Sequence, residues 1–440
     1  VLPGPTEPLP EPLRAAVEAL RTEALAAHVR FLASPALEGR GLGSPGLEAA
    51  LEYAVSQLAL AGVAPLGPSF FQPVPFREIR EPGGSVELER RSGETAQRRT
   101  FLSGADVVVP PQQARSVTAP VVFAGFGIRE AARGRDDYRG LDVKGRIVAV
   151  REGLPPGEVW TAKELVSKYA EGDAEERWTE KVRTAKALGA VGVLAVEGEK
   201  WTERLTGKEK PESFAFRSLV ESTEPLVVRS SPVVLEALLG APPKPDEAAR
   251  ALPGVVATLR ATGVERLGLS RNVVGVLPGS DPSLKEEAVV LGAHVDHLGR
   301  VEGVIHPGAD DNASGVAAVL EIARSLASAP VRPKRTVVFA FWTGEEEDKI
   351  GSGHWVRNPL WPLGRTATYL NFDMIGHPWL AEEIRTLATG AGLPDAEGVV
   401  SRLKPEEFVE PGLASWAPDL GPILARAGRA TGLTLHLDWT

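Results

Sequence analysis

Two kinds of hydrophobic pattern occur along this chain. Short runs in which apolar and polar residues alternate, such as SVELERR at 85–91, predict β-strands between residues 70 and 109. From residue 271 onward, apolar runs such as AVVLGAH at 288–294 are followed by helical spacing, as in SGVAAVLEIARSLASA at 314–329. Strands that alternate with helices are typical of a largely parallel sheet with helices on its faces. We therefore predict an α/β fold.

The same pattern divides the chain into three segments. The first, 1–112, ends at a proline pair. The second, 113–262, contains the strands APVVFAGFGI and VGVLAVEG and an amphipathic helix, so we expect a separate α/β unit there. The third, 263–440, holds the remaining strands and helices. A Gly-rich stretch at Gly39–Gly46 follows a helical pattern rather than a strand, so we interpret it as a turn and not as a dinucleotide site.

Composition excludes several classes of function. The chain has 49 basic and 58 acidic residues, a net charge of −9, and no basic stripe, so nucleic acid is not an expected partner. No stretch approaches the roughly 20 apolar residues of a membrane span. The chain has no cysteine, which excludes disulfides, thiol nucleophiles and cysteine-type zinc sites. Histidine and carboxylates are therefore the strong metal ligands available.

Side chains that can bind metal follow the ends of successive predicted strands in the third segment. Carboxyl ends of strands share one edge of an open α/β sheet, so these groups are expected to converge there. Taken singly, each has an ordinary explanation, such as a helix cap or a solvated turn. Together they place so much negative charge at one edge that a cation must compensate it, and the donor types suit one or two zinc ions. The groups are His294 with Asp296, Asp310 with Asp311, Glu345 to Glu347, and Asp373.

Four segments of this region resemble the successive signatures of the M28 family of dinuclear zinc aminopeptidases, in the same order and at similar spacing. They read GAHVDHLG, PGADDNASGVAAVLEIARSL, RTVVFAFWTGEEEDKIGS and NFDMIG. The upstream HVRFLASPALEGRGLGSPG is similar to the N-terminal region of bacterial members, and 113–262 resembles the protease-associated (PA) domain inserted in many of them. The resemblance implies a mixed sheet flanked by helices, formed by 1–112 and 263–440, with a PA-type α/β insert.

The resemblance also implies a role for each site residue. His294 and Asp373 would bind one zinc ion, Glu346 the other, and Asp311 would bridge the two. Asp311 is chosen over its neighbour because the family ligand stands directly before Asn-x-Ser-Gly; the peptide bond after it is cis in the family. Glu345 matches the general base in the removal of N-terminal residues from peptides. Asp296 would hold the ring of His294 in its tautomer.

The sequence departs from the family pattern in two places. Asp348 and Lys349 stand where Gly and Leu are usual. The histidine that completes the second zinc site in the family comes from a later segment that has no counterpart here, so we expect the chain to be truncated at its C-terminal end. His436 is a weaker candidate for that ligand because its neighbours alternate like those of an ordinary strand. His297, His306, His354 and His377 are expected in loops or beside the ligands.

Two other functions are compatible with the sequence. One is a single-zinc enzyme similar to glutaminyl cyclases, and the other is a receptor-like relative that has lost catalysis. Retention of the four ligands and the base favours the dinuclear peptidase over both. Bacterial members with this arrangement are usually exported, so the resemblance implies a secreted or periplasmic protein whose leader is missing from this chain. The residues do not define the oligomeric state or the preferred N-terminal residue of the substrate.

Overall fold

The computed structural model describes residues 8–171, 176–198, 201–206, 214–220, 222–390, 396–402, 408–409, 411–414, 417, 419–431, 433–435 and 438–439. The chain forms two compact units. Unit 1 consists of Val1–Val74 and Leu269–Thr440, and unit 2 consists of Pro75–Gly268. The chain passes from one unit to the other within two long strands, β2 (Phe71–Ser92) and β12 (Arg250–Leu277).

Unit 1 contains a mixed sheet in the strand order β17-β13-β16-β12. Its centre is parallel: β13 (Ala288–His294) pairs in parallel with β16 (Thr336–Trp342) on one side and with β17 (Thr366–Asn371) on the other. The end of β12 pairs antiparallel with β16 and with the short strand β1 (Ala64–Pro65). The prediction of a mixed sheet in an α/β fold is confirmed.

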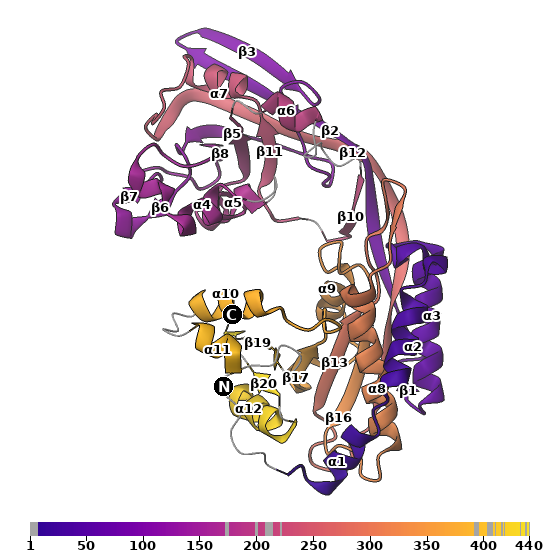
Figure 1. Ribbon diagram of the computed structural model, residues 1–440. Helices are drawn as coiled ribbons and strands as arrows, with labels where there is room; N and C mark the ends of the chain where they lie inside the picture. The colour runs from indigo at the N-terminus through magenta and orange to yellow at the C-terminus, as the bar shows by residue number, and fades with distance from the viewer. Residues whose placement is uncertain are drawn as a thin grey trace. The chain divides into compact units, whose positions relative to one another are not determined.

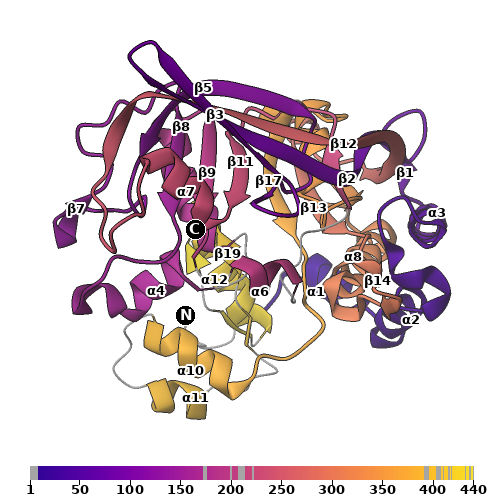
Figure 2. The ribbon, with the colours of Figure 1, turned by 90° about the horizontal axis from the view of Figure 1, so that it is seen from above.

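Helices cover both faces of this sheet. Side chains alternate between the faces of a strand, so Val290, Val338 and Ala340 point to one face, where they pack with Trp355 of α9 (Ile350–Arg357). Against the other face lies α8 (Gly315–Ser328), with α2 (Thr22–Leu32) and α3 (Pro45–Leu60) beside it (Figures 1 and 2). Ser44 begins α3 as an N-cap, and its hydroxyl accepts a hydrogen bond from Leu47 N–H. The stretch before it is the turn that the sequence predicts.

The remaining described elements of unit 1 are shorter. An N-terminal helix, α1, packs against α8. The hairpin of β14 and β15 follows the end of β13 and packs against the 3-10 turn η1. Their bounds are α1 (Glu11–Glu18), η1 (Pro35–Arg40), β14 (Gly299–Val301), β15 (Val304–His306), the π-helical turn η4 (Ala309–Ser314), η5 (Leu363–Arg365), α10 (Ala381–Gly390), α11 (Ala396–Arg402), β18 (Phe408–Val409), β19 (Gly412–Leu413), α12 (Leu420–Thr431), β20 (Thr434–Leu435) and β21 (Asp438–Trp439).

Unit 2 is a second α/β structure with its own core. Its parallel strands run in the order β5-β8-β9-β11, and β12 and β4 pair antiparallel at the two ends. Leu235 of α7 packs on one face of these strands, and Trp178 of α5 packs on the other. The bounds are β3 (Thr95–Leu102), β4 (Val107–Val108), β5 (Arg115–Phe123), β6 (Arg129–Glu130), η2 (Ala131–Arg133), β7 (Arg135–Asp136), β8 (Ile147–Arg151), η3 (Glu158–Thr161), α4 (Lys163–Tyr169), α5 (Glu176–Ala187), β9 (Gly192–Val196), α6 (Trp201–Thr206), β10 (Phe214–Ser218), β11 (Leu226–Ser230) and α7 (Pro232–Leu239).

The predicted boundary near residue 112 requires correction. Unit 2 begins at Pro75 and ends at Gly268, whereas the sequence pattern placed it at 113–262. The reason is that β2 pairs with both β3 and β10, and that Val86 and Phe101 lie in the same core as Ile147. A hydrophobic pattern locates strands but does not show which core they join. The likeness of this unit to a PA domain remains a prediction.

Among the described helices, none combines the length and the apolar character needed to cross a bilayer.

Candidate metal centre

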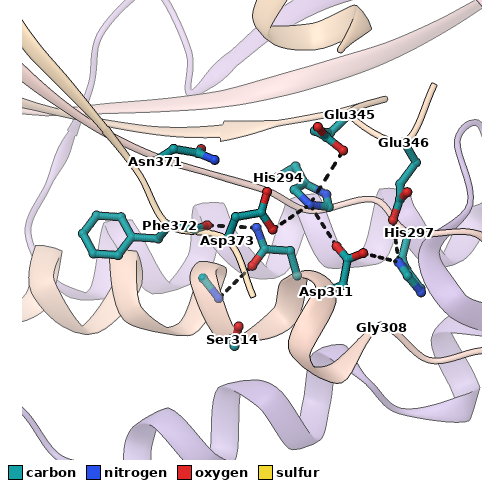
Figure 3. A network of polar contacts seen from close by, with 12 residues as sticks. His294, His297, Gly308, Asp311, Ser314, Glu345, Glu346, Asn371, Phe372 and Asp373 are labelled. Carbon is teal, nitrogen blue, oxygen red and sulfur yellow. Dashed lines mark hydrogen bonds and ion pairs between the residues drawn. The ribbon is translucent and has the colours of Figure 1, made fainter. Parts of the chain in front are cut away.

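Three neighbouring parallel strands of unit 1 bring the predicted ligands together. His294 is the last residue of β13, the central strand of the three. Asp373 follows β17 on one side, and Glu345 and Glu346 follow β16 on the other. Asp311 enters from η4, just before α8. The side chains converge at the carboxyl ends of the strands, where ligands bind in open α/β sheets (Figure 3).

The first group of donors surrounds His294, which is 2% exposed. Its Nε2 atom lies 3.1 Å from Asp311 Oδ1 and 3.4 Å from Asp373 Oδ1. Zinc holds nitrogen and oxygen ligands at about 2.0–2.2 Å in a tetrahedral arrangement, so two ligands of one ion lie about 3.3 Å apart. The separations in this group are therefore those of three ligands around one zinc ion.

The turn that carries Asp311 also distinguishes it from Asp310. Asp310 points to the loop after β17, where its carboxylate accepts a hydrogen bond from Gly376 N–H at 2.6 Å and contacts His377 Nδ1. Asn312 fixes the turn from the other side, since its side-chain amide donates to Phe372 O at 2.9 Å and its side-chain oxygen accepts from Gly315 N–H at 3.0 Å. The Asp311–Asn312 peptide bond is cis, as the resemblance implies.

Asp296 is 1% exposed and supports two of the donors. Its main-chain oxygen lies 3.1 Å from His294 Nδ1 and accepts a hydrogen bond when that nitrogen is protonated. Its carboxylate accepts a hydrogen bond from Glu346 N–H at 3.2 Å, and its Oδ1 lies 3.8 Å from His294 Nδ1. The acceptor for the ring Nδ1–H is thus the main-chain oxygen of Asp296 rather than its carboxylate, which is turned toward Glu346.

Glu345 lies at the edge of the first group. Its Oε2 is 4.0 Å from His294 Nε2, beyond the spacing of two ligands on one ion. Its other oxygen, Oε1, pairs with the Lys349 ammonium at 3.2 Å. The lysine side chain is 72% exposed, so water and salt weaken this pair. The residue that departs from the family pattern thus contacts the candidate base.

A second group of donors consists of His297, Asp311 and Glu346, so it shares Asp311 with the first group. The sequence pattern predicts His297 only as a loop residue or a neighbour of the ligands. His297 Nδ1 lies 2.6 Å from Glu346 Oε1 and 3.7 Å from Asp311 Oδ2. All three side chains offer a ligand atom within 4.8 Å of the others. The contact between His297 and Glu346 has the length of a hydrogen bond, shorter than the spacing of two ligands on one zinc ion. The spacing of His294 and His297 in HVDH gives no sign of this contact, because it depends on how the loop after β13 turns.

The pKa shifts of the donor residues show that the site favours positive charge. Burial disfavours the charged ring of His294, but Asp296 and Asp373 outweigh burial and raise its pKa to about 11. Burial and the charge of Glu346 raise the pKa of Asp311. The hydrogen bond from His297 lowers the pKa of Glu346 in spite of its burial. The carboxylates around His294 thus favour positive charge at this position.

The donor set fits zinc. It consists of imidazole and carboxylate groups at ligand spacing, with no competing lysine among the close contacts of His294. One buried oxygen, Asp296 Oδ1, has no hydrogen-bond partner among the described residues and faces the Nδ1 side of the His294 ring. A metal bound at Nε2 would leave the proton at Nδ1, where the main-chain oxygen and the carboxylate of Asp296 could both stabilise it.

Other histidines named by the sequence analysis lie outside both groups of donors. His306 ends β15, His354 lies in α9, and His377 contacts Asp310. His436, the alternative candidate for the missing ligand, lies outside the described residues.

A mixed α/β sheet that gathers imidazole and carboxylate donors at the carboxyl ends of its strands has the architecture of a metal-dependent hydrolase. Residues 272–405 match Peptidase family M28. The matched segment contains all members of both donor groups.

Similar proteins include several that are named as aminopeptidases. The "Probable lipoprotein aminopeptidase LpqL" of Mycobacterium tuberculosis is 28% identical over 362 residues, which cover 81% of this chain and 59% of that protein. An "Aminopeptidase" of Pseudomonas aeruginosa is 44% identical over 109 residues, 24% of this chain and 18% of that protein. The chain thus spans less than two thirds of the length of these relatives.

Among solved structures, an aminopeptidase from Aneurinibacillus sp. strain AM-1 is similar with a TM-score of 0.42 and 21% identity, covering 82% of this chain and 72% of that one. The zinc aminopeptidase BSAP of Bacillus subtilis is similar with a TM-score of 0.36 and 21% identity, covering 85% and 78% of the two chains.

Proposed function

We propose that this protein is a zinc-dependent aminopeptidase that removes N-terminal residues from peptides, with two zinc ions in the working enzyme. The observation that carries the proposal is the position of His294 Nε2, which lies 3.1 Å from Asp311 and 3.4 Å from Asp373 at the ends of parallel strands. The match of residues 272–405 to a peptidase family and the names of the relatives support the reaction class.

His294, Asp311 and Asp373 would hold the first ion, and Asp311 and Glu346 would hold the second. Zinc, when bound, supplies the Lewis acidity that lowers the pKa of the attacking water and polarises the scissile carbonyl. Glu345 accepts the proton of that water and later donates it to the leaving amine, since its carboxylate borders the first group without belonging to it. The carboxylates around the site favour a substrate that presents a free, positively charged N-terminus.

The simplest test compares metal-free and zinc-loaded protein. We expect protein stripped with a chelator to lose hydrolysis of an aminoacyl anilide and to regain it when zinc is added. The same anilide with an acetylated N-terminus should not be cleaved, because it lacks the ammonium group. Full activity in protein shown by elemental analysis to contain no metal would refute the proposal.

His297 is proposed to orient Glu346 rather than to bind metal, because its Nδ1 lies at hydrogen-bond distance from Glu346 Oε1. The His297→Ala variant should therefore bind the second zinc ion about 10–100-fold more weakly, the usual effect of losing a group that supports a ligand. The first ion should bind as in the wild type. Zinc titration against a chromogenic chelator would show this. Complete loss of the second ion, with a changed cobalt absorption spectrum, would instead make His297 a ligand.

The same protein can be used to test the alternative function, that of a glutaminyl-cyclase-like enzyme. A peptide with N-terminal glutamine would lose ammonia and keep its length if that alternative holds, whereas an aminopeptidase shortens the peptide by one residue. Two donor groups that share Asp311 favour the peptidase, because they provide for two ions and not one.

A further inference from the structure

Arg40 is a buried charge next to the metal centre that the mechanism does not use. It is 1% exposed and lies at the end of η1, in the Gly-rich stretch that the sequence analysis interpreted as a turn. A guanidinium group is rarely buried without partners, because its five N–H donors and its charge must be satisfied. Its partners therefore indicate what it does.

The guanidinium group donates hydrogen bonds to four main-chain carbonyls and, in the contacts described, to no carboxylate. Nε donates to Val295 O at 2.7 Å, and Nη2 donates to Gly308 O at 2.9 Å. Nη1 donates to Pro307 O at 2.8 Å and also to Leu32 O. The main chain of Arg40 takes part as well, since its carbonyl accepts a hydrogen bond from His297 N–H at 3.2 Å.

Three of these carbonyls belong to the two loops that carry the site, and the fourth, Leu32 O, belongs to the end of α2. Residues 295–297 follow His294 and contain Asp296 and His297, and residues 307–308 lead into Asp311. One planar group thus ties together segments that reach the site from different directions. An arginine suits this task better than a lysine, because its donors form a rigid fork and a lysine ammonium is a single point.

The chain around Arg40 is shaped to bring the guanidinium group there. Arg40 has a φ of +54°, and Gly39 before it has a φ of +74°. A Cβ atom on Gly39 would lie 2.3 Å from His306 O, and one on Gly308 would lie 2.7 Å from Arg40 Nη2. The turn and the loops approach each other so closely that only glycine fits at both places.

The positive charge of Arg40 also acts on the carboxylates of the site. Burial lowers its pKa to about 10, while Asp296, Asp311 and Glu346 act in the opposite direction, so the group is charged at neutral pH. Its charge and these carboxylates attract each other through space. Since its hydrogen bonds go to carbonyls, the carboxylate oxygens stay available for metal.

We infer that Arg40 is a positioning residue of the metal centre, which fixes the 295–297 and 307–308 loops in their metal-binding arrangement before an ion arrives. This inference rests on the proposed metal site. It extends the functional site to a residue more than 250 positions earlier in the chain than the ligands it positions.

The first experiment compares Arg40→Lys with Arg324→Lys, the same substitution in another arginine of unit 1. Arg324 pairs with Glu321 and donates to Ala19 O, so its side-chain hydrogen bonds lie outside the two loops. Zinc affinity is measured by chelator competition, at a temperature where circular dichroism shows both metal-free variants folded. We expect about 10–100-fold weaker zinc binding in Arg40→Lys, with an altered cobalt absorption spectrum, and wild-type values in Arg324→Lys.

Wild-type affinity and an unchanged cobalt spectrum in Arg40→Lys would overturn the inference while leaving the proposed function intact. Failure of the wild-type protein to bind zinc or cobalt would overturn the proposed function as well. Equal losses in the two variants would show a general effect on folding and would also overturn the inference.

A second measurement needs no variant and covers the case in which Arg40→Lys does not fold. Hydrogen–deuterium exchange of the wild-type protein, with and without zinc, reports on the peptides around His297 and Gly308. If Arg40 fixes the loops in advance, these peptides are already protected in the metal-free protein and gain little on adding zinc. Rapid exchange without metal and protection only with metal would contradict the inference.

Discussion

The Asp311→Asn variant is expected to lose tight binding of both zinc ions, and with it all measurable hydrolysis. Asp311 is the one side chain common to the two donor groups, with Oδ1 3.1 Å from His294 Nε2 and Oδ2 3.7 Å from His297 Nδ1. An asparagine has no charge and only one oxygen, so it cannot serve two cations. Zinc affinity should fall by more than the roughly 100-fold that marks the upper range for supporting residues.

The neighbouring aspartate provides a matched control. The Asp310→Asn variant carries the same change one residue earlier, where the amide oxygen can still accept the hydrogen bond from Gly376 N–H. Zinc titration and elemental analysis should give wild-type binding for this variant. If Asp311→Asn bound two ions as tightly as the Asp310→Asn control does, the assignment of the bridging residue would be wrong.

The second large effect is expected at Glu345, the proposed general base. In Glu345→Gln, kcat should fall by about 10²–10⁴-fold, because the amide keeps the shape of the side chain but cannot take up a proton. Zinc content should stay at the wild-type level, since Glu345 lies outside both donor groups. In Glu346→Gln we expect the opposite: the variant loses zinc, and its activity falls because the metal is lost.

These two variants also test the register of the glutamate run. If Glu345→Gln lost zinc and Glu346→Gln kept it, the roles assigned to the two residues would have to be exchanged. Anilide hydrolysis measured over a range of zinc concentrations separates the two cases, because excess zinc restores a variant with weakened metal binding but not one without a base.

Strand ends could be located from the sequence because the relevant signal is local. His294, Asp373 and the glutamates each follow an apolar run that forms a strand, and parallel neighbours carry their ends to one edge. The choice of Asp311 over Asp310 came from the family motif, and the structure directs the two side chains to different partners. The placement of the site residues between His294 and Asp373 could thus largely be predicted from the sequence.

What the sequence did not reveal depends on contacts between distant residues. The role of Arg40 was missed because three of its four partners lie more than 250 residues away, and because all four are main-chain carbonyls, which leave no side-chain pattern. The contact of His297 with Glu346 needs the turn after β13. The start of unit 2 was displaced because strand pairing across the core, rather than the local proline pair, decides which unit β2 joins.

Sharing of one carboxylate between two donor groups has a consequence for how the protein fills with metal. If two ions bind as proposed, the first would withdraw electron density from Asp311 and add positive charge beside the second donor group, so the two binding steps would not be independent. Loading would then be sequential, with unequal dissociation constants, and a singly occupied form would accumulate when zinc is scarce. The availability of free zinc in the surroundings would in this way set the fraction of fully competent molecules, through the weaker of the two steps.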